Sequence, residues 1–158
     1  MDKWQDIYIN NQKLDNIFIE KYSSDKEIYE KNVIGLLVEL GEFINETKCF
    51  KYWSIKKPDK EKVLEEYADC ITLSMTFLNH AKLNNMPRPY NTNNILELLN
   101  YIYKETTKLY TNNDIEIAKK ILSNILYIKD LLGIDEQELI DACKKKQAII
   151  LERLNSDY

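Results

Sequence analysis

The chain contains few of the residues that metal–thiolate, disulfide and glycine-loop chemistry require. It has one histidine, His80, and three scattered cysteines among 158 residues. This set cannot supply a paired-cysteine zinc site, a three-histidine site or a disulfide framework, so we expect the cysteines to stay reduced. None of its three glycines belongs to a P-loop, and no glycine-x-glycine fingerprint occurs. A nucleotide site built on a glycine-rich loop is therefore excluded.

Excess positive charge and long apolar runs are also absent. Lys and Arg number 22 while Asp and Glu number 26, which gives a formal net charge of −4. This balance argues against broad electrostatic binding to nucleic acid or to an anionic membrane, although a local patch remains compatible with a small anionic ligand. The longest apolar stretch, residues 33–38, is too short to span a membrane, and the first residues form no apolar signal core. We expect a cytoplasmic protein with no nucleic-acid or membrane partner.

Turn-forming residues are too few for a protein with many strands. Three Gly and three Pro accompany 44% hydrophobic and 30% charged residues, a composition typical of a helix-rich protein. The length suits a single domain, residues 1–158. The spacing of apolar side chains predicts an all-α bundle of five to six helices, at about residues 4–22, 27–47, 58–83, 95–110, 114–132 and 135–158.

Local signals mark several of the predicted helix ends. Ser24 and Glu27 have the spacing of a capping box, which predicts a helix start at this point. Pro58 suits the first position of the third helix, and Gly133 suits a C-cap.

Four acidic side chains are spaced to meet between the second and third predicted helices. Glu39 and Glu42 lie at positions i and i+3 of one helix, and Glu66 and Asp69 repeat this spacing on the next. Antiparallel packing would bring the two pairs together, where cations would be needed to neutralise them. Hard carboxylate oxygens suit Mg²⁺ or Mn²⁺ bound together with substrate phosphates, whereas a single histidine excludes a di-iron bundle. The alternative is that all four are solvated acids on charge-rich helices.

The loop that joins these two helices mixes basic and aromatic side chains. Lys48 and Lys51 can act as point charges for phosphate, while Phe50, Tyr52 and Trp53 offer flat faces on which a base can stack. The alternative is that the aromatic side chains plug the end of the bundle and the lysines are solvated. Beside the paired acids, the loop favours a nucleotide site.

Longer motifs carry a resemblance to a known family. Residues 39–54, ELGEFINETKCFKYWS, followed by residues 65–69, EEYAD, closely resemble the dimeric dUTPase family of the all-α (MazG-like) NTP pyrophosphatase superfamily. The paired Glu-x-x-Glu and Glu-x-x-Asp motif is typical of the superfamily. The Glu-Asn-Glu stretch that runs into Phe-Lys-x-Trp is typical of the dUTPase branch. Matches near both termini extend the resemblance to nearly the whole domain.

This resemblance implies a function and a set of site residues. It implies a homodimer that hydrolyses dUTP to dUMP and pyrophosphate, with an active site close to the subunit interface. It also implies that Glu39, Glu42, Glu66 and Asp69 hold Mg²⁺ and that Glu39 assists the attacking water. The substrate-binding residues implied by the resemblance are Gln12, Asn45, Lys51, Trp53, Lys146, Arg153 and Tyr158.

Two alternatives to dUTP hydrolysis remain open at the level of sequence. Thr72 and Leu73 stand where the family usually has His-Phe, and Ile150 stands at a position where it usually has asparagine. These differences favour, as the first alternative, a dCTP-directed or broad-specificity house-cleaning nucleoside triphosphate pyrophosphatase. The second is a non-catalytic helical interaction protein, because charged amphipathic helices also suit partner binding.

Overall fold

The computed structural model describes residues 2–156, and six α-helices form its regular structure. No strand occurs among these residues, so the predicted all-α fold and the predicted number of helices are confirmed. None of the helices in the described part of the chain is long and apolar enough to cross a membrane. The helices are α1 (Asp2–Lys21), α2 (Ile28–Thr47), α3 (Lys60–Thr76), α4 (Ile95–Leu109), α5 (Ile115–Leu132) and α6 (Glu136–Asn155).

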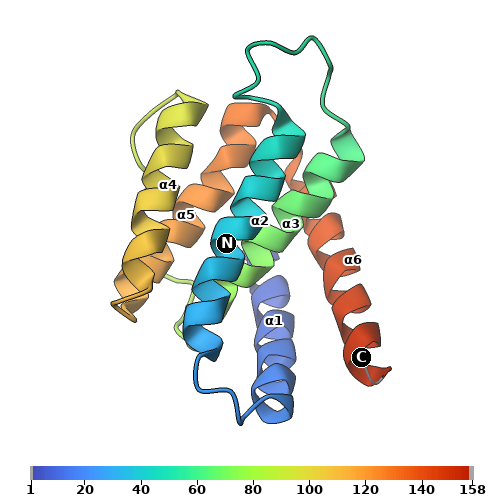
Figure 1. Cartoon of the computed structure of the whole chain (residues 1–158), viewed down its shortest axis with the longest axis vertical. Helices are drawn as coiled ribbons and strands as arrows, with labels where there is room; N and C mark the ends of the chain where they lie inside the picture. Colours follow the sequence, from blue (N-terminus) through green and yellow to red (C-terminus); the bar gives the residue numbers. More distant parts are fainter. Residues whose placement is uncertain (1, 157–158) are drawn as a thin grey trace.

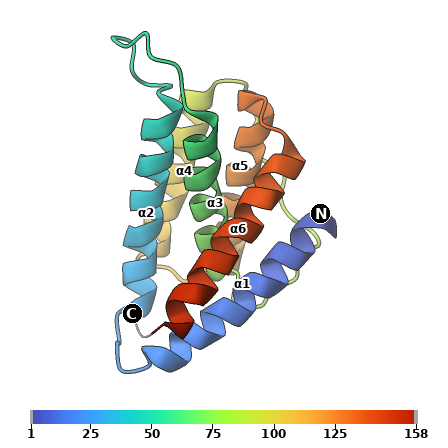
Figure 2. The same ribbon diagram turned by 90° about the vertical axis from the view of Figure 1, so that its right-hand side faces the viewer.

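Helix α3 lies at the centre of the bundle. It runs antiparallel to α2, and it also contacts α1, α5 and α6, while α4 covers α2 and α5 (Figure 1). Figure 2 shows α6 crossing in front of α3, with α2 on one side and α1 beside the lower half of α6. The loop between α2 and α3 projects beyond the ends of both helices (Figure 1). Side chains from α2, α3 and α6 can therefore meet around the central helix.

Buried aromatic side chains fix the α2–α3 contact. Phe43 of α2 is 1% exposed, and its ring centroid lies 4.8 Å from that of the fully buried Tyr67 of α3. The Tyr67 hydroxyl donates a hydrogen bond to the carbonyl of Ile125 at 2.5 Å and accepts one from the backbone N–H of Lys129 at 2.9 Å. Because buried polar groups are costly when unpaired, these bonds also hold α5 against the helix pair.

Short polar side chains set most helix starts. Asp59, Asn94, Asp114 and Asp135 occupy the N-caps of α3 to α6, and each accepts a hydrogen bond from a backbone N–H of its first turn. Gly133 closes α5 with a φ of 66°, a left-handed conformation that glycine adopts without strain, which confirms the predicted C-cap.

Two predicted start signals are wrong, although α2 begins at Ile28, within one residue of its predicted start. Glu27 stands at the N-cap of α2 without a side-chain capping bond, and the carboxylate of Asp25 rather than the hydroxyl of Ser24 accepts from its backbone N–H, at 2.8 Å. Pro58 precedes α3 instead of opening it, because Asp59 supplies the cap one residue later. At α3 the neighbouring Asp59 accepts from two free backbone donors, whereas at α2 Asp25 accepts only from the N–H of the N-cap residue itself.

The predicted end of the third helix is also wrong. Helix α3 ends at Thr76 instead of continuing to Leu83. Asn79 and His80 take left-handed conformations, with φ of 47° and 65°, which turn the chain away. The apolar pattern runs on because Leu83 is still buried, although its backbone is no longer helical.

Candidate functional site

Three of the four predicted acids converge between α2 and α3. One carboxylate oxygen from each of Glu39, Glu42 and Glu66 lies within 4.8 Å of the other two. The i, i+3 spacing on α2 directs the first two side chains toward the antiparallel helix α3, which contributes the third. The structure therefore brings together groups separated by more than twenty residues of sequence, as the helical spacing predicts.

The fourth acid, Asp69, is paired with a cation of the protein itself. The ammonium of Lys146 on α6 lies 2.8 Å from a carboxylate oxygen of Asp69 and 3.7 Å from one of Glu65. The side chains of Asp69 and Lys146 are only 19% and 15% exposed. A pair so shielded from water is screened by salt much less than a surface ion pair. Lys146 therefore neutralises one edge of the acidic cluster.

Burial and mutual repulsion act most strongly on Glu39. Burial, followed by the charges of Asp69, Glu42 and Glu66, raises the pKa of Glu39 to about 7. Its Oε2 atom is buried and has no hydrogen-bond partner within residues 2–156. A buried carboxylate oxygen without a donor is unfavourable unless a cation or a ligand contacts it. The cluster offers only hard oxygen donors, which fit Mg²⁺ or Mn²⁺.

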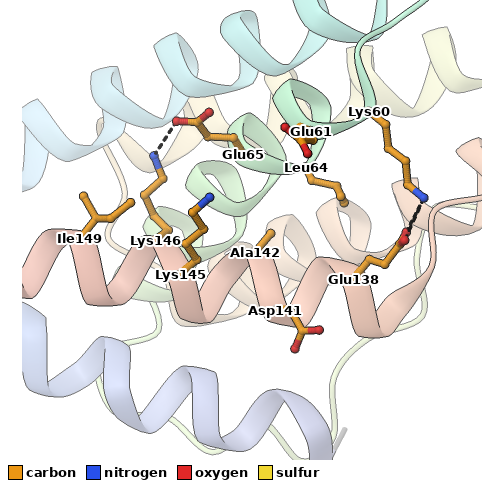
Figure 3. A pocket seen from close by; sticks show the side chains of 10 residues that line it. All are labelled: Lys60, Glu61, Leu64, Glu65, Glu138, Asp141, Ala142, Lys145, Lys146 and Ile149. Atoms are coloured by element: carbon orange, nitrogen blue, oxygen red, sulfur yellow. Dashed lines mark hydrogen bonds and ion pairs between the residues drawn. The ribbon is translucent and has the colours of Figure 1, made fainter.

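A hollow of about 600 Å³ lies between α3 and α6 and reaches Lys146 (Figure 3). The Lys60–Glu138 ion pair, at 2.8 Å, lies at one end, and Lys146 faces Glu65 at the other. The remaining lining residues are Glu61, Leu64, Asp141, Ala142, Lys145 and Ile149. Through Lys146 this hollow adjoins the acidic cluster, although none of the four clustered acids lines it.

The aromatic loop is exposed. Trp53 is 64% exposed and Tyr52 is 96% exposed, and Trp53 contacts the ring of Phe50 edge-on with 6.0 Å between the ring centroids. The alternative that Phe50 and Trp53 plug the end of the bundle is therefore wrong. A hollow of about 510 Å³ is lined by Lys48, Lys51, Trp53, Ser54, Ile55 and Lys56, and by none of the four acids.

The other predicted site residues lie on three different helices. Gln12 is half-buried on α1, Asn45 is exposed in the last turns of α2, and Arg153 is exposed in the last turn of α6. Tyr158 lies outside the described residues. Asn45 lies three residues after Glu42 on α2, whereas Gln12 and Arg153 lie on other helices.

A comparison with protein families identifies the family of the chain. A family model described as dUTPase matches residues 3–158, nearly the whole chain. The chain belongs to the dUTPase family. This dUTPase is accordingly an enzyme, a nucleoside triphosphate pyrophosphohydrolase with dUTP diphosphatase activity. No match to the chain was found among curated proteins or among solved structures.

Membership of the family resolves one alternative that the sequence left open. The non-catalytic interaction protein is wrong, because the whole-chain match is to an enzyme family. The family acts on a nucleotide substrate, which supports dUTP as the substrate of this chain, and the family is generally metal-dependent. The clustered carboxylates are the feature of the structure that suits such a metal.

Sequence reasoning missed two arrangements in this dUTPase. It did not connect Lys146 with Asp69, since only the crossing of α6 over α3 brings them together. It also overlooked the polar contact in which Asp15 accepts hydrogen bonds from Asn11 at 3.1 Å and from Thr76 at 3.0 Å. Burial raises the pKa of Asp15 to about 6. The i, i+4 spacing of Asn11 and Asp15 was the available signal.

Proposed function

We propose that this dUTPase hydrolyses dUTP to dUMP and pyrophosphate with Mg²⁺ held by Glu39, Glu42, Glu66 and Asp69. The observation that supports this most is the approach of three carboxylates to within 4.8 Å of one another, with the buried Oε2 atom of Glu39 left without a partner in the described residues. When bound, Mg²⁺ would neutralise phosphate charge, align the triphosphate and lower the pKa of a bound water.

In this proposal Glu39 orients the attacking water and accepts its proton. Its Oε2 atom is buried and has no hydrogen-bond partner in the described residues, and burial together with the neighbouring acids raises the pKa of Glu39 to about 7 in the metal-free protein. A general base is most effective when its pKa is near the working pH. Glu39 is therefore the acid that we assign to accept the proton of the attacking water, and no protein nucleophile is needed.

We assign the residues outside the cluster to substrate binding. The ring of Trp53, exposed on the loop, is available for stacking on the base, and the adjacent Lys51 can pair with phosphate. Gln12 offers an amide for recognition of the base edge. The other proposed contacts to phosphate, sugar or base are Asn45, Lys146, Arg153 and Tyr158.

The direct test is pyrophosphate release from dUTP, dCTP, dTTP and UTP, first with Mg²⁺ and then with EDTA. We expect dUTP to be cleaved with a kcat/KM at least about tenfold above that of the other nucleotides, since a polar pocket rejects a base that leaves its groups unpaired. EDTA is expected to stop the reaction. Cleavage that favours dCTP, or that ignores the base, would assign the protein to the broader pyrophosphatases instead.

We also propose a homodimer that buries the outer face of α2. Ile34 and Val38 lie one helical turn apart and are 50% and 53% exposed. The same face continues one turn further to Glu42, so a partner seated on these apolar side chains would border the acidic cluster. This placement supports an active site close to the subunit interface.

The dimer proposal predicts that Val38→Asp separates the subunits. A charge placed on an apolar contact must be desolvated, which is strongly unfavourable. Light scattering is expected to give the variant the 18.8 kDa mass of one chain and the parent protein twice that mass. As a control, Lys60→Ala changes an exposed residue of α3 and should leave the parent mass unaltered. A variant that stays dimeric would place the interface elsewhere.

A further inference from the structure

We propose that Lys146 is an internal counter-ion, which a divalent cation must displace from Asp69 and which then becomes free to bind the substrate phosphates. The inference rests on the proposed metal site and deepens it. In this inference, metal binding begins with an exchange of cations, in which the divalent ion replaces the Lys146 ammonium at the Asp69 carboxylate.

The contacts of Asp69 carry this inference. Its carboxylate lies one turn along α3 from Glu66, so it borders the three acids that approach one another. Its nearest cation is the Lys146 ammonium, at 2.8 Å. A divalent ion bound close to the same oxygens would repel that ammonium, because like charges a few ångströms apart interact strongly where water is partly excluded. The free protein thus holds three clustered acids and a fourth that is already paired.

The Lys146 ammonium, once displaced from Asp69, has a second acceptor and space in which to move. Glu65 is 61% exposed and already lies 3.7 Å from the nitrogen of Lys146, so it offers a second acceptor. The hollow of about 600 Å³ between α3 and α6 gives the side chain room to move (Figure 3). A triphosphate bound near the acids presents several anionic oxygens, with which an ammonium forms strong charge-assisted hydrogen bonds.

The exchange makes metal and nucleotide bind cooperatively. A divalent cation that displaces Lys146 from Asp69 makes the Lys146 ammonium available to the phosphates. Conversely, a phosphate that attracts Lys146 leaves the Asp69 carboxylate available to the cation. Such coupling is reciprocal, since each ligand must raise the affinity for the other by the same factor. If Lys146 only contacted phosphate, its replacement would not change metal binding in the absence of nucleotide.

The test is Mn²⁺ binding to the full-length protein without nucleotide, measured by titration calorimetry. Lys146→Gln removes the competing charge, so the Kd for Mn²⁺ is expected to fall about fivefold or more. The kcat/KM for dUTP is expected to fall as well, because the phosphates lose a cation. Lys145→Gln is the matched control: it removes the same charge from the neighbouring exposed position and should leave the Kd for Mn²⁺ unchanged.

The outcomes separate this inference from the proposed function. If the parent protein binds Mn²⁺ and Lys146→Gln binds it equally or less tightly, only the counter-ion role is overturned. If Lys145→Gln tightens binding as much, a general charge effect replaces the exchange and the inference is again wrong. If the parent protein binds no Mn²⁺, both the metal site and the exchange fall. Lys146→Met, which keeps an apolar stem beside Ala142 and Ile149, serves as a second variant should Lys146→Gln unfold.

Discussion

Replacement of Glu39 by Gln is expected to lower the kcat for dUTP hydrolysis by about 10²- to 10⁴-fold, the range typical of a lost general base. Gln preserves the size of the side chain but cannot take a proton from water, and it is a poorer ligand for Mg²⁺ than a carboxylate. The rate of pyrophosphate release at saturating dUTP and Mg²⁺ measures the effect. Circular dichroism is expected to show the same helical content as in the parent protein.

The same variant is expected to stabilise the metal-free fold at alkaline pH. Burial and the neighbouring acids raise the pKa of Glu39 from 4.5 to about 7, so the folded state binds more protons than the unfolded state between these two values. The contribution of Glu39 to stability therefore falls as the pH rises through this window. Without metal, Glu39→Gln should melt above the parent protein at pH 8, and the difference should shrink as the pH approaches 4.5.

A second glutamate of α2 provides the control for both measurements. Glu30 lies nine residues before Glu39, about 13 Å along the helix axis, and is not one of the clustered acids. Glu30→Gln is expected to keep the kcat of the parent protein. If the kcat of Glu39→Gln lies within about tenfold of that value, Glu39 is not the general base. Such a result would not test its role as a metal ligand.

The sequence predicts the acidic cluster well because its geometry is set by one helical repeat. Spacing of i, i+3 places Glu39 beside Glu42 on any α-helix, and the next helix along the chain packs antiparallel against α2. The pairing of Asp69 with Lys146 depends instead on how α6 crosses α3, and no local pattern near Lys146 encodes that crossing. Local periodicity therefore identifies the clustered acids, whereas the pairing of Asp69 with Lys146 is visible only in the tertiary structure.

Helix ends are harder to predict because several polar residues compete for the same backbone donors. Ser24 and Asp25 are both capable of capping, yet α2 begins without a side-chain cap, and Asp25 accepts only from the backbone N–H of Glu27. At the end of α3 the apolar pattern continues to Leu83, so burial alone gives no sign that the backbone turns at Asn79. The site is largely insensitive to these errors, since its acids lie inside α2 and α3.

The largest loss of stability is expected from Phe43→Ala, at about 3–5 kcal/mol. The ring is 1% exposed and lies 4.8 Å from that of Tyr67, so its removal leaves a cavity between α2 and α3 directly beside Glu42. Such a loss is a large part of the roughly 5–15 kcal/mol that stabilises an ordinary domain. Urea denaturation without metal, at one fixed protein concentration, measures the change in the free energy of unfolding.

Phe43→Leu separates packing from any other effect of the aromatic ring. Leu refills most of the space, so it is expected to cost only about 1–1.5 kcal/mol. Because α2 and α3 each carry part of the acidic cluster, a cavity between them should also weaken Mn²⁺ binding in Phe43→Ala more than in Phe43→Leu. A loss below about 1 kcal/mol for Phe43→Ala would show that this ring does not hold the two helices together. The alignment of the carboxylates on α2 and α3 would then depend on the other buried side chains of α2, Val33, Leu36 and Leu40.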